Sequence, residues 1–118
     1  MNKVAKALAN TLLTHRLARL QEHPPGKRII ERNYTITYGD LCQRAAFPGT
    51  PQSVGRFLGE IAQWCADNDL PPINSLAVNA ESGIPGESYD GAAECSIANW
   101  PAELEACVRS SEYPSRVS

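Results

Sequence analysis

The chain of 118 residues lacks the sequence signatures of the common enzyme classes. It contains no G-x-S-x-G nucleophile motif, no phosphate-binding P-loop, no G-x-G-x-x-G dinucleotide motif and no paired-carboxylate motif. Its acidic residues are scattered through expected turns and one helix face. We therefore expect a protein that is not an enzyme and that binds no cofactor.

Metal-binding side chains are few, and their spacing does not suit a metal site. His15 and His23 are the two histidines, and neither has a cysteine at ligand spacing. The four cysteines, at positions 42, 65, 95 and 107, form no C-x-x-C pair. We expect no bound metal, and four reduced thiols that are mostly buried rather than two disulfides.

Long apolar runs are also missing. Hydrophobic residues make up 42% of the chain, which is typical of a globular protein, but they are too interrupted for a membrane span. The first residues do not resemble an export signal, because Asn10 and His15 break the apolar run. We expect a cytoplasmic protein with one domain over residues 1–109, followed by a mobile tail over residues 110–118 with nothing to pack against.

Charge is distributed very unevenly along the chain. Residues 1–58 contain nine Lys and Arg and three carboxylates, a formal charge of +6, whereas residues 59–118 contain two Arg and ten carboxylates, a formal charge of −8. The small net charge of −2 therefore does not exclude a polyanionic partner for the first half. It does argue against strong non-specific DNA binding, which requires clustered cations.

Hydrophobic spacing and capping signals predict a mainly helical α+β chain. Leu8, Leu12, Leu17 and Leu20 recur at helical spacing, and they predict an amphipathic helix over residues 3–22. The other expected elements are an extended segment over 33–37, a helix over 38–45 capped by Thr37, a helix from Pro51 to Asp67, a strand over 73–78 and a helix over 100–109 capped by Asn99.

Two glycines lie four residues apart in the helix expected from Pro51 to Asp67. Glycine inside a helix costs about 1 kcal/mol relative to alanine. Gly55 and Gly59 therefore indicate the close approach of another backbone or of a ligand, and packing is the commoner cause.

One stretch resembles a known family. It consists of Ile-Thr-Tyr-Gly-Asp-Leu at positions 36–41 and Phe-Pro-Gly-Thr-Pro-Gln-Ser-Val-Gly-Arg-Phe-Leu at positions 47–58. In order and spacing this is similar to the DNA-binding domain of the alkylguanine-DNA alkyltransferases and alkyltransferase-like proteins. The resemblance covers about residues 34–90. It implies a winged helix-turn-helix, here with an added N-terminal and a C-terminal helix, in which residues 73–83 supply the strand and wing.

The chain departs from that family at the positions that matter for chemistry. The family's P-C-H-R-V acceptor motif falls on residues 73–77, where Asn74 stands in place of the reactive cysteine. The arginine that the family inserts into the DNA stack aligns with Gln52, and residues 63–70 are an insertion. Alkyl transfer to position 74 is therefore chemically impossible.

These observations leave two main functional hypotheses. The first is a non-catalytic protein that binds duplex DNA through Tyr38, Arg44, Gln52, Ser53 and Arg56, with Tyr38 matching a family position that contacts the DNA backbone. The second is a small phage or mobile-element protein that inhibits or regulates a host factor through its acidic half. Clustering of cations on the helix face from Gln52 to Arg56 would favour the first hypothesis.

Overall fold

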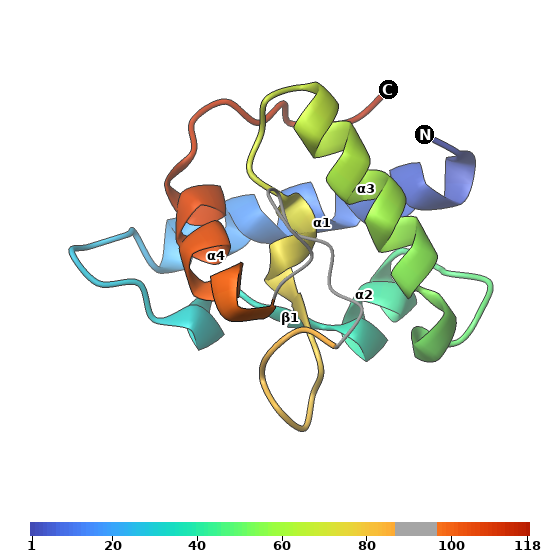
Figure 1. The fold of residues 1–118 in the computed structure, drawn as a ribbon, viewed down its shortest axis with the longest axis horizontal. Helices are drawn as coiled ribbons and strands as arrows, with labels where there is room; N and C mark the ends of the chain where they lie inside the picture. Colours follow the sequence, from blue (N-terminus) through green and yellow to red (C-terminus); the bar gives the residue numbers. More distant parts are fainter. Residues whose placement is uncertain (87–96) are drawn as a thin grey trace.

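A computed structural model describes residues 1–86 and 97–118, and these residues form a mainly helical α+β fold, as predicted (Figure 1). The regular elements, in chain order, are α1 (Lys3–Glu22), β1 (Ile36–Thr37), α2 (Tyr38–Arg44), α3 (Gly55–Asp67), β2 (Ala77–Val78) and α4 (Trp100–Arg109). Four short 3₁₀ turns connect them: η1 (Glu31–Asn33), η2 (Pro51–Ser53), η3 (Ile73–Leu76) and η4 (Ile97–Asn99).

Helix α1 has the predicted bounds and forms one wall of the core. Asn2 caps its N-terminus, since the side-chain Oδ1 of Asn2 accepts a hydrogen bond of 2.8 Å from the backbone N–H of Ala5. Its buried stripe continues from Leu12 and Leu13 to His15 and Arg16. Leu17, expected on the apolar face, is instead 44% exposed, because the polar His15 and Arg16 occupy the buried positions of that turn.

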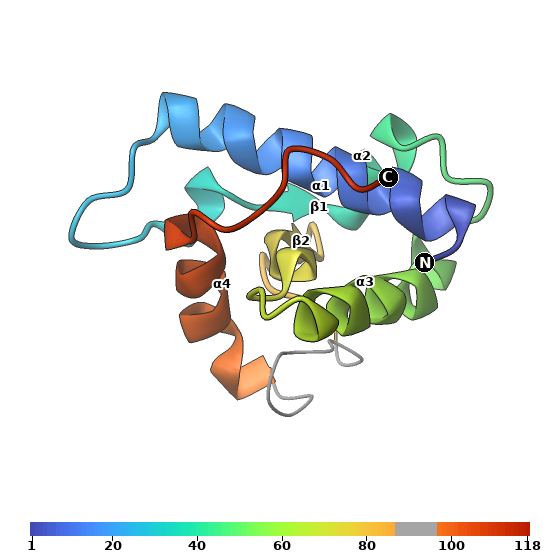
Figure 2. The same cartoon turned by 90° about the horizontal axis from the view of Figure 1, so that it is seen from above.

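The segment before β2 lies at the centre of the molecule. Figure 2 shows η3 and β2 between α1 and α3, and Ile73 and Leu76 are fully buried there. The predicted strand over 73–78 is wrong for its first four residues, which form the 3₁₀ turn η3. Pro72 sets the start of that turn, and its carbonyl accepts the N–H of Ser75 at 3.0 Å, which is turn geometry rather than strand pairing.

The two strands are short and parallel. Ile36 pairs with Ala77, and Thr37 pairs with Val78. The extended segment expected over 33–37 is reduced to Ile36–Thr37, because Glu31–Asn33 form the 3₁₀ turn η1. After β2 the chain turns between Asn79 and Ile84, where Gly83 has a φ of +73°. Within the described residues, the strands therefore do not form the antiparallel hairpin of a wing.

Helices α2 and α3 follow the predicted order with a different junction. Thr37 caps α2 as predicted, since its Oγ1 accepts the N–H of Asp40 at 3.2 Å. The helix expected from Pro51 to Asp67 is broken into η2 and α3. The N–H of Ser53 bonds to the carbonyl of Thr50, and Val54 turns its side chain into the core, so the regular α-helix begins only at Gly55.

Helix α4 has the predicted bounds, but Asn99 makes no side-chain cap to it. The expectation that residues 110–118 have nothing to pack against is wrong. Val117 is buried, and its N–H and carbonyl both bond to the Asn10 side chain, at 2.6 and 3.2 Å. Figure 2 shows this tail running back along α1.

Arg16 joins α1, α4 and the tail. Its guanidinium is buried, and it donates to the carbonyls of Cys107 at 2.9 Å, of Val108 at 3.5 Å and of Ser110. The same group lies 4.6 Å from the centre of the Tyr113 ring. A cation at a helix C-terminus satisfies carbonyls that have no partner inside the helix.

The cysteines within the described residues are Cys42, Cys65 and Cys107, and all three are free and buried. This confirms the expectation of reduced, buried thiols for these positions, and Cys95 lies outside the described residues. No helix in the described part of the chain is long and apolar enough to cross a membrane.

We predict that Arg16→Met lowers the free energy of unfolding by about 2–4 kcal/mol, because three buried carbonyls lose their donor while the apolar stem is retained. Urea denaturation measures the change. Arg116→Met is the matched control, since Arg116 is an exposed arginine in the tail over residues 110–118. We expect this control to change stability by less than about 0.5 kcal/mol. Equal stabilities of the two variants would contradict this role of Arg16.

Candidate functional site

A cavity of about 320 Å³ opens between the start of α2, the η2–α3 junction, η3 and the turn after β2. Its polar side chains come from four separate segments of the chain: Tyr38, Gln52, Asn74 and Asn79. Pro51, Val54 and Leu58 supply apolar wall. All of the described lining residues are uncharged, so this site suits a neutral ligand with hydrogen-bonding edges better than a free anion or cation.

Tyr38 is held in place at the rim. Its hydroxyl accepts a hydrogen bond of 2.9 Å from the backbone N–H of Gly86. Burial raises the pKa of the Tyr38 phenol above its ordinary value of 10, against the lowering effect of this bond. The phenol therefore keeps its proton at neutral pH and presents a neutral aromatic ring to the cavity.

The two asparagines occupy different depths. Asn74 is 2% exposed and lies in η3, within the core of the protein. Asn79 is exposed and directly follows β2, and its Oδ1 accepts the N–H of Glu81 at 2.9 Å. A side-chain amide carries N–H donors and a carbonyl acceptor. Amides in the lining therefore suit a ligand edge that has hydrogen-bond acceptors and donors side by side.

Small residues keep the backbone accessible around the cavity. Gly55 lines it at the first turn of α3. Gly39 lines it from α2, and a Cβ added there would meet no atom within 4 Å.

The structure brings together two of the five predicted site residues. Tyr38 and Gln52 both line the cavity. Ser53 lies outside the lining, and its Oγ donates to the Thr50 carbonyl at 2.8 Å. Arg56 is exposed and also lies outside the lining, with its guanidinium 4.6 Å from the centre of the Phe57 ring.

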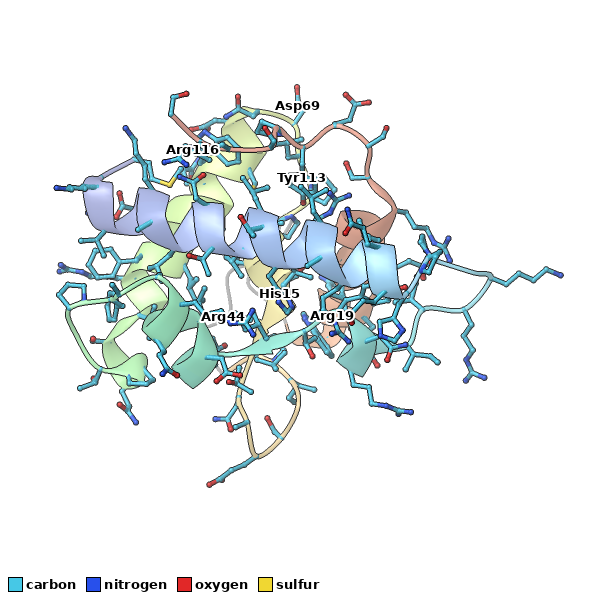
Figure 3. All side chains as sticks on the ribbon, turned by 180° about the vertical axis from the view of Figure 1, so that it is seen from behind. His15, Arg19, Arg44, Asp69, Tyr113 and Arg116 are labelled. Atoms are coloured by element: carbon cyan, nitrogen blue, oxygen red, sulfur yellow. The ribbon has the colours of Figure 1, made fainter. Side chains whose placement is uncertain are left out.

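Arg44, the fifth residue, faces α1 instead. Its Nη1 lies 3.5 Å from Nδ1 of His15, and Figure 3 shows the two side chains next to each other. A cluster of cations on the helix face from Gln52 to Arg56, which would favour the DNA-binding hypothesis, is therefore not present in the described structure, where Arg56 is the one cation of α3.

Sequence reasoning missed Asn79 and Gly86 as parts of the site. Both depend on contacts between distant segments: the parallel pairing of Thr37 with Val78, and the hydrogen bond from Gly86 to Tyr38. The turn signal around Gly83 could have indicated that the chain folds back after β2, but not onto which element.

His15 is a buried histidine with a defined tautomer. Its Nε2 lies 3.0 Å from the carbonyl of Tyr34 and 3.2 Å from that of Thr35, so Nε2 carries the proton and donates. Nδ1 then accepts from Arg44. Burial lowers the pKa of the His15 imidazole below 6.5, and the positive charges of Arg44 and Arg19 lower it further, although the two carbonyls oppose this.

The described thiols and carboxylates offer neither a nucleophile nor a metal site. Burial raises the pKa of the Cys42 and Cys107 thiols, and it raises that of Cys65 to about 11. A thiol with a raised pKa is a poor nucleophile at neutral pH. Among the described residues, no group of three His, Cys, Asp or Glu side chains is placed to hold a metal ion.

Comparison of the chain with protein-family models, with curated proteins and with solved structures finds no match. The resemblance of residues 34–90 to the alkyltransferases therefore stays a prediction from short motifs.

We predict that His15 makes stability depend on pH. Because its pKa is lower in the folded chain than the ordinary 6.5, the unfolded chain binds this proton more readily. The stabilisation is complete above about pH 6.5, and it is lost as the pH falls below that value, by at most about 1.4 kcal/mol per pH unit. His15→Gln, which can still donate to the two carbonyls, should unfold with a shallower dependence between about pH 7.5 and 5.5. Denaturant titrations that give the same pH dependence for both proteins would contradict this.

We also predict that the protein does not accept alkyl groups from DNA. Incubation with an oligonucleotide that carries an alkylated guanine should leave the intact mass unchanged, because the resemblance places an asparagine, Asn74, at the family's acceptor position and the described thiols are buried. The urea-unfolded chain, treated with a thiol reagent, is the control, because unfolding exposes every cysteine. A stoichiometric alkyl adduct on any cysteine would refute this assignment of Asn74.

Proposed function

We propose that this protein is a non-catalytic nucleic-acid-binding protein that holds one unpaired base in the cavity beside Tyr38. The observation that carries this proposal is the uncharged lining of the cavity, in which a tyrosine ring and three side-chain amides meet at one site. The cavity volume of about 320 Å³ falls in the range of small-molecule sites, and it can accommodate a nucleobase.

The chemistry of the lining fits a base better than other parts of a nucleic acid. Bases outside a helix are bound by stacking on aromatic rings and by hydrogen bonds to their edges. Tyr38 offers a ring, and Gln52 and Asn79 offer side-chain amide groups at the edge of the site. A phosphate would instead be expected to meet Arg or Lys side chains, and none is present in the described part of the lining.

The surroundings of the cavity also support nucleic acid as the partner. Arg56 is exposed one residue after Gly55, so a phosphate next to a bound base has a cation nearby. The resemblance to the alkyltransferases implies a DNA contact at Tyr38 and places Gln52 where that family inserts an arginine into the stack. The asparagine at the acceptor position supports binding without reaction.

Binding to duplexes of about 20 base pairs, with or without one central unpaired base, tests this function. We expect wild-type protein to prefer the unpaired base. Gln52→Ala should reduce that preference by about 1–3 kcal/mol and leave the salt dependence unchanged, because the amide is neutral. Arg56→Ala should weaken binding to both duplexes equally and lower the salt slope by about one unit, as expected for a lost phosphate contact.

Gln43→Ala is the matched control for Gln52→Ala, because Gln43 is an exposed glutamine of α2 outside the cavity. It should bind as wild type does. Fluorescence anisotropy at about 50 mM salt gives nucleic-acid binding its best chance. If wild-type protein at about 100 μM binds neither duplex under these conditions, the proposal is wrong, and a protein-interaction module takes its place.

A further inference from the structure

The loop between α1 and η1 is unusually exposed and basic. Within residues 24–32, every residue except the half-buried Ile29 is exposed. Lys27, Arg28 and Arg32 are its cations, and Glu31 is its single carboxylate. We call residues 24–32 the basic loop.

The cations of the basic loop have no partners within the described structure, whereas the arginines around them do. Arg19 pairs with Glu22 at 2.8 Å, and Arg109 pairs with Glu105 at 3.0 Å. The side chains of Lys27, Arg28 and Arg32 make no ion pair with any described residue. The loop therefore presents positive charge to solvent that its neighbours do not neutralise.

Side-chain hydrogen bonds hold the backbone at or near both ends of the loop. Near its start, Nη2 of Arg109 donates to the Gly26 carbonyl at 2.6 Å, and the Tyr34 hydroxyl donates to the His23 carbonyl at 2.6 Å. Beyond its end, Nε of Arg19 donates to the Asn33 carbonyl at 2.6 Å. A loop fixed in this way presents its cations at a defined place, which reduces the entropy lost on binding.

The basic loop lies at one end of the molecule, and the cavity lies between the centre and the other end. In Figure 1 the loop projects at one end of the longest axis, and α2 and the segment that carries η2 lie towards the other end. The extent along that axis is 38 Å. The two sites are separated by part of this length, which corresponds to several base pairs of B-DNA at about 3.4 Å per pair.

We infer that the basic loop is a second contact site, which binds phosphates of the same nucleic acid several base pairs away from the base held in the cavity. This inference rests on the proposed function. It assigns phosphate contacts to Lys27, Arg28 and Arg32, which no motif in the sequence indicated, and it gives Arg44 no such role because that side chain contacts His15.

The test compares two triple variants on two lengths of nucleic acid. One variant is Lys27→Ala, Arg28→Ala and Arg32→Ala. The matched control is Lys3→Ala, Lys6→Ala and Arg116→Ala, which removes the same charge from the first turns of α1 and from the tail. The probes are a duplex of about 24 base pairs and a hairpin of about six, each with one central unpaired base, and only the longer one spans a helical turn on one side of that base.

On the long duplex, we expect the loop variant to lower the slope of log affinity against log salt by about two to three units, one for each lost phosphate contact. The control variant should lower it by less than about one unit. On the hairpin, the loop variant should bind as wild type does, because the hairpin is too short to reach the loop. Circular dichroism checks that both variants remain folded.

Three results separate the failure of this inference from that of the proposed function. Equal slopes for the loop variant and the control on the long duplex would overturn the inference alone. An equal loss on both probes would overturn the separation of the two contact sites, and the inference with it. A third result would be a lower salt slope for the loop variant together with no preference of the wild-type protein for the unpaired base. This result would support the loop as a phosphate site and overturn the base-binding function.

Discussion

The burial of Arg16 against the C-terminal end of α4 is the interaction on which the arrangement of the other elements depends. A buried guanidinium that has no carboxylate partner among the described residues is tolerated because the carbonyls of Cys107, Val108 and Ser110 accept hydrogen bonds from it. This fixes α4 relative to α1. At the other end of α4, Trp100 Nε1 donates to the Ser75 carbonyl at 2.8 Å, which anchors η3 beside the cavity residue Asn74. The deepest polar group of the cavity is thus positioned by contacts that begin on the first helix.

The short parallel pairing of β1 and β2 closes the rest of the site. Thr37 pairs with Val78 at the ends of the two strands. The residues that directly follow them, Tyr38 and Asn79, both line the cavity. Two pairs of residues are a weak sheet, so their register must be maintained by burial: Ile36, Ala77 and Val78 are all in the core. The cavity is therefore a consequence of core packing and does not depend on a long sheet.

Local signals in the sequence predicted the helices well, because caps and apolar periodicity act within a few residues. Thr37 caps α2, and α1 and α4 have the expected bounds. The errors fall where distant contacts decide. Leu17 is exposed because Arg16 has partners on α4, and Val117 is buried because Asn10 bonds both sides of its backbone.

The site was predictable to the extent that its residues follow local breaks in the chain. Tyr38 begins a capped helix and Gln52 lies next to a proline, and both line the cavity. Arg44 does not line the cavity, because its side chain contacts His15. Ser53 does not line it either, because the helix is broken at Val54, the next residue. Asn79 joins the site only through strand pairing with a segment some forty residues earlier, which no local pattern reveals.

Charge counted along the sequence overstates the cationic surface. The first 58 residues have a formal charge of +6, yet the guanidinium of Arg16 is buried at α4 and that of Arg19 binds Asn33 and Glu22. Because these two arginines already have partners within the protein, a larger share of the remaining positive charge lies in the segment after α1. Phosphate contacts give affinity and register, whereas contacts to bases give selectivity. In the function proposed above, the cavity would supply the base contacts and the separate basic loop the phosphate contacts.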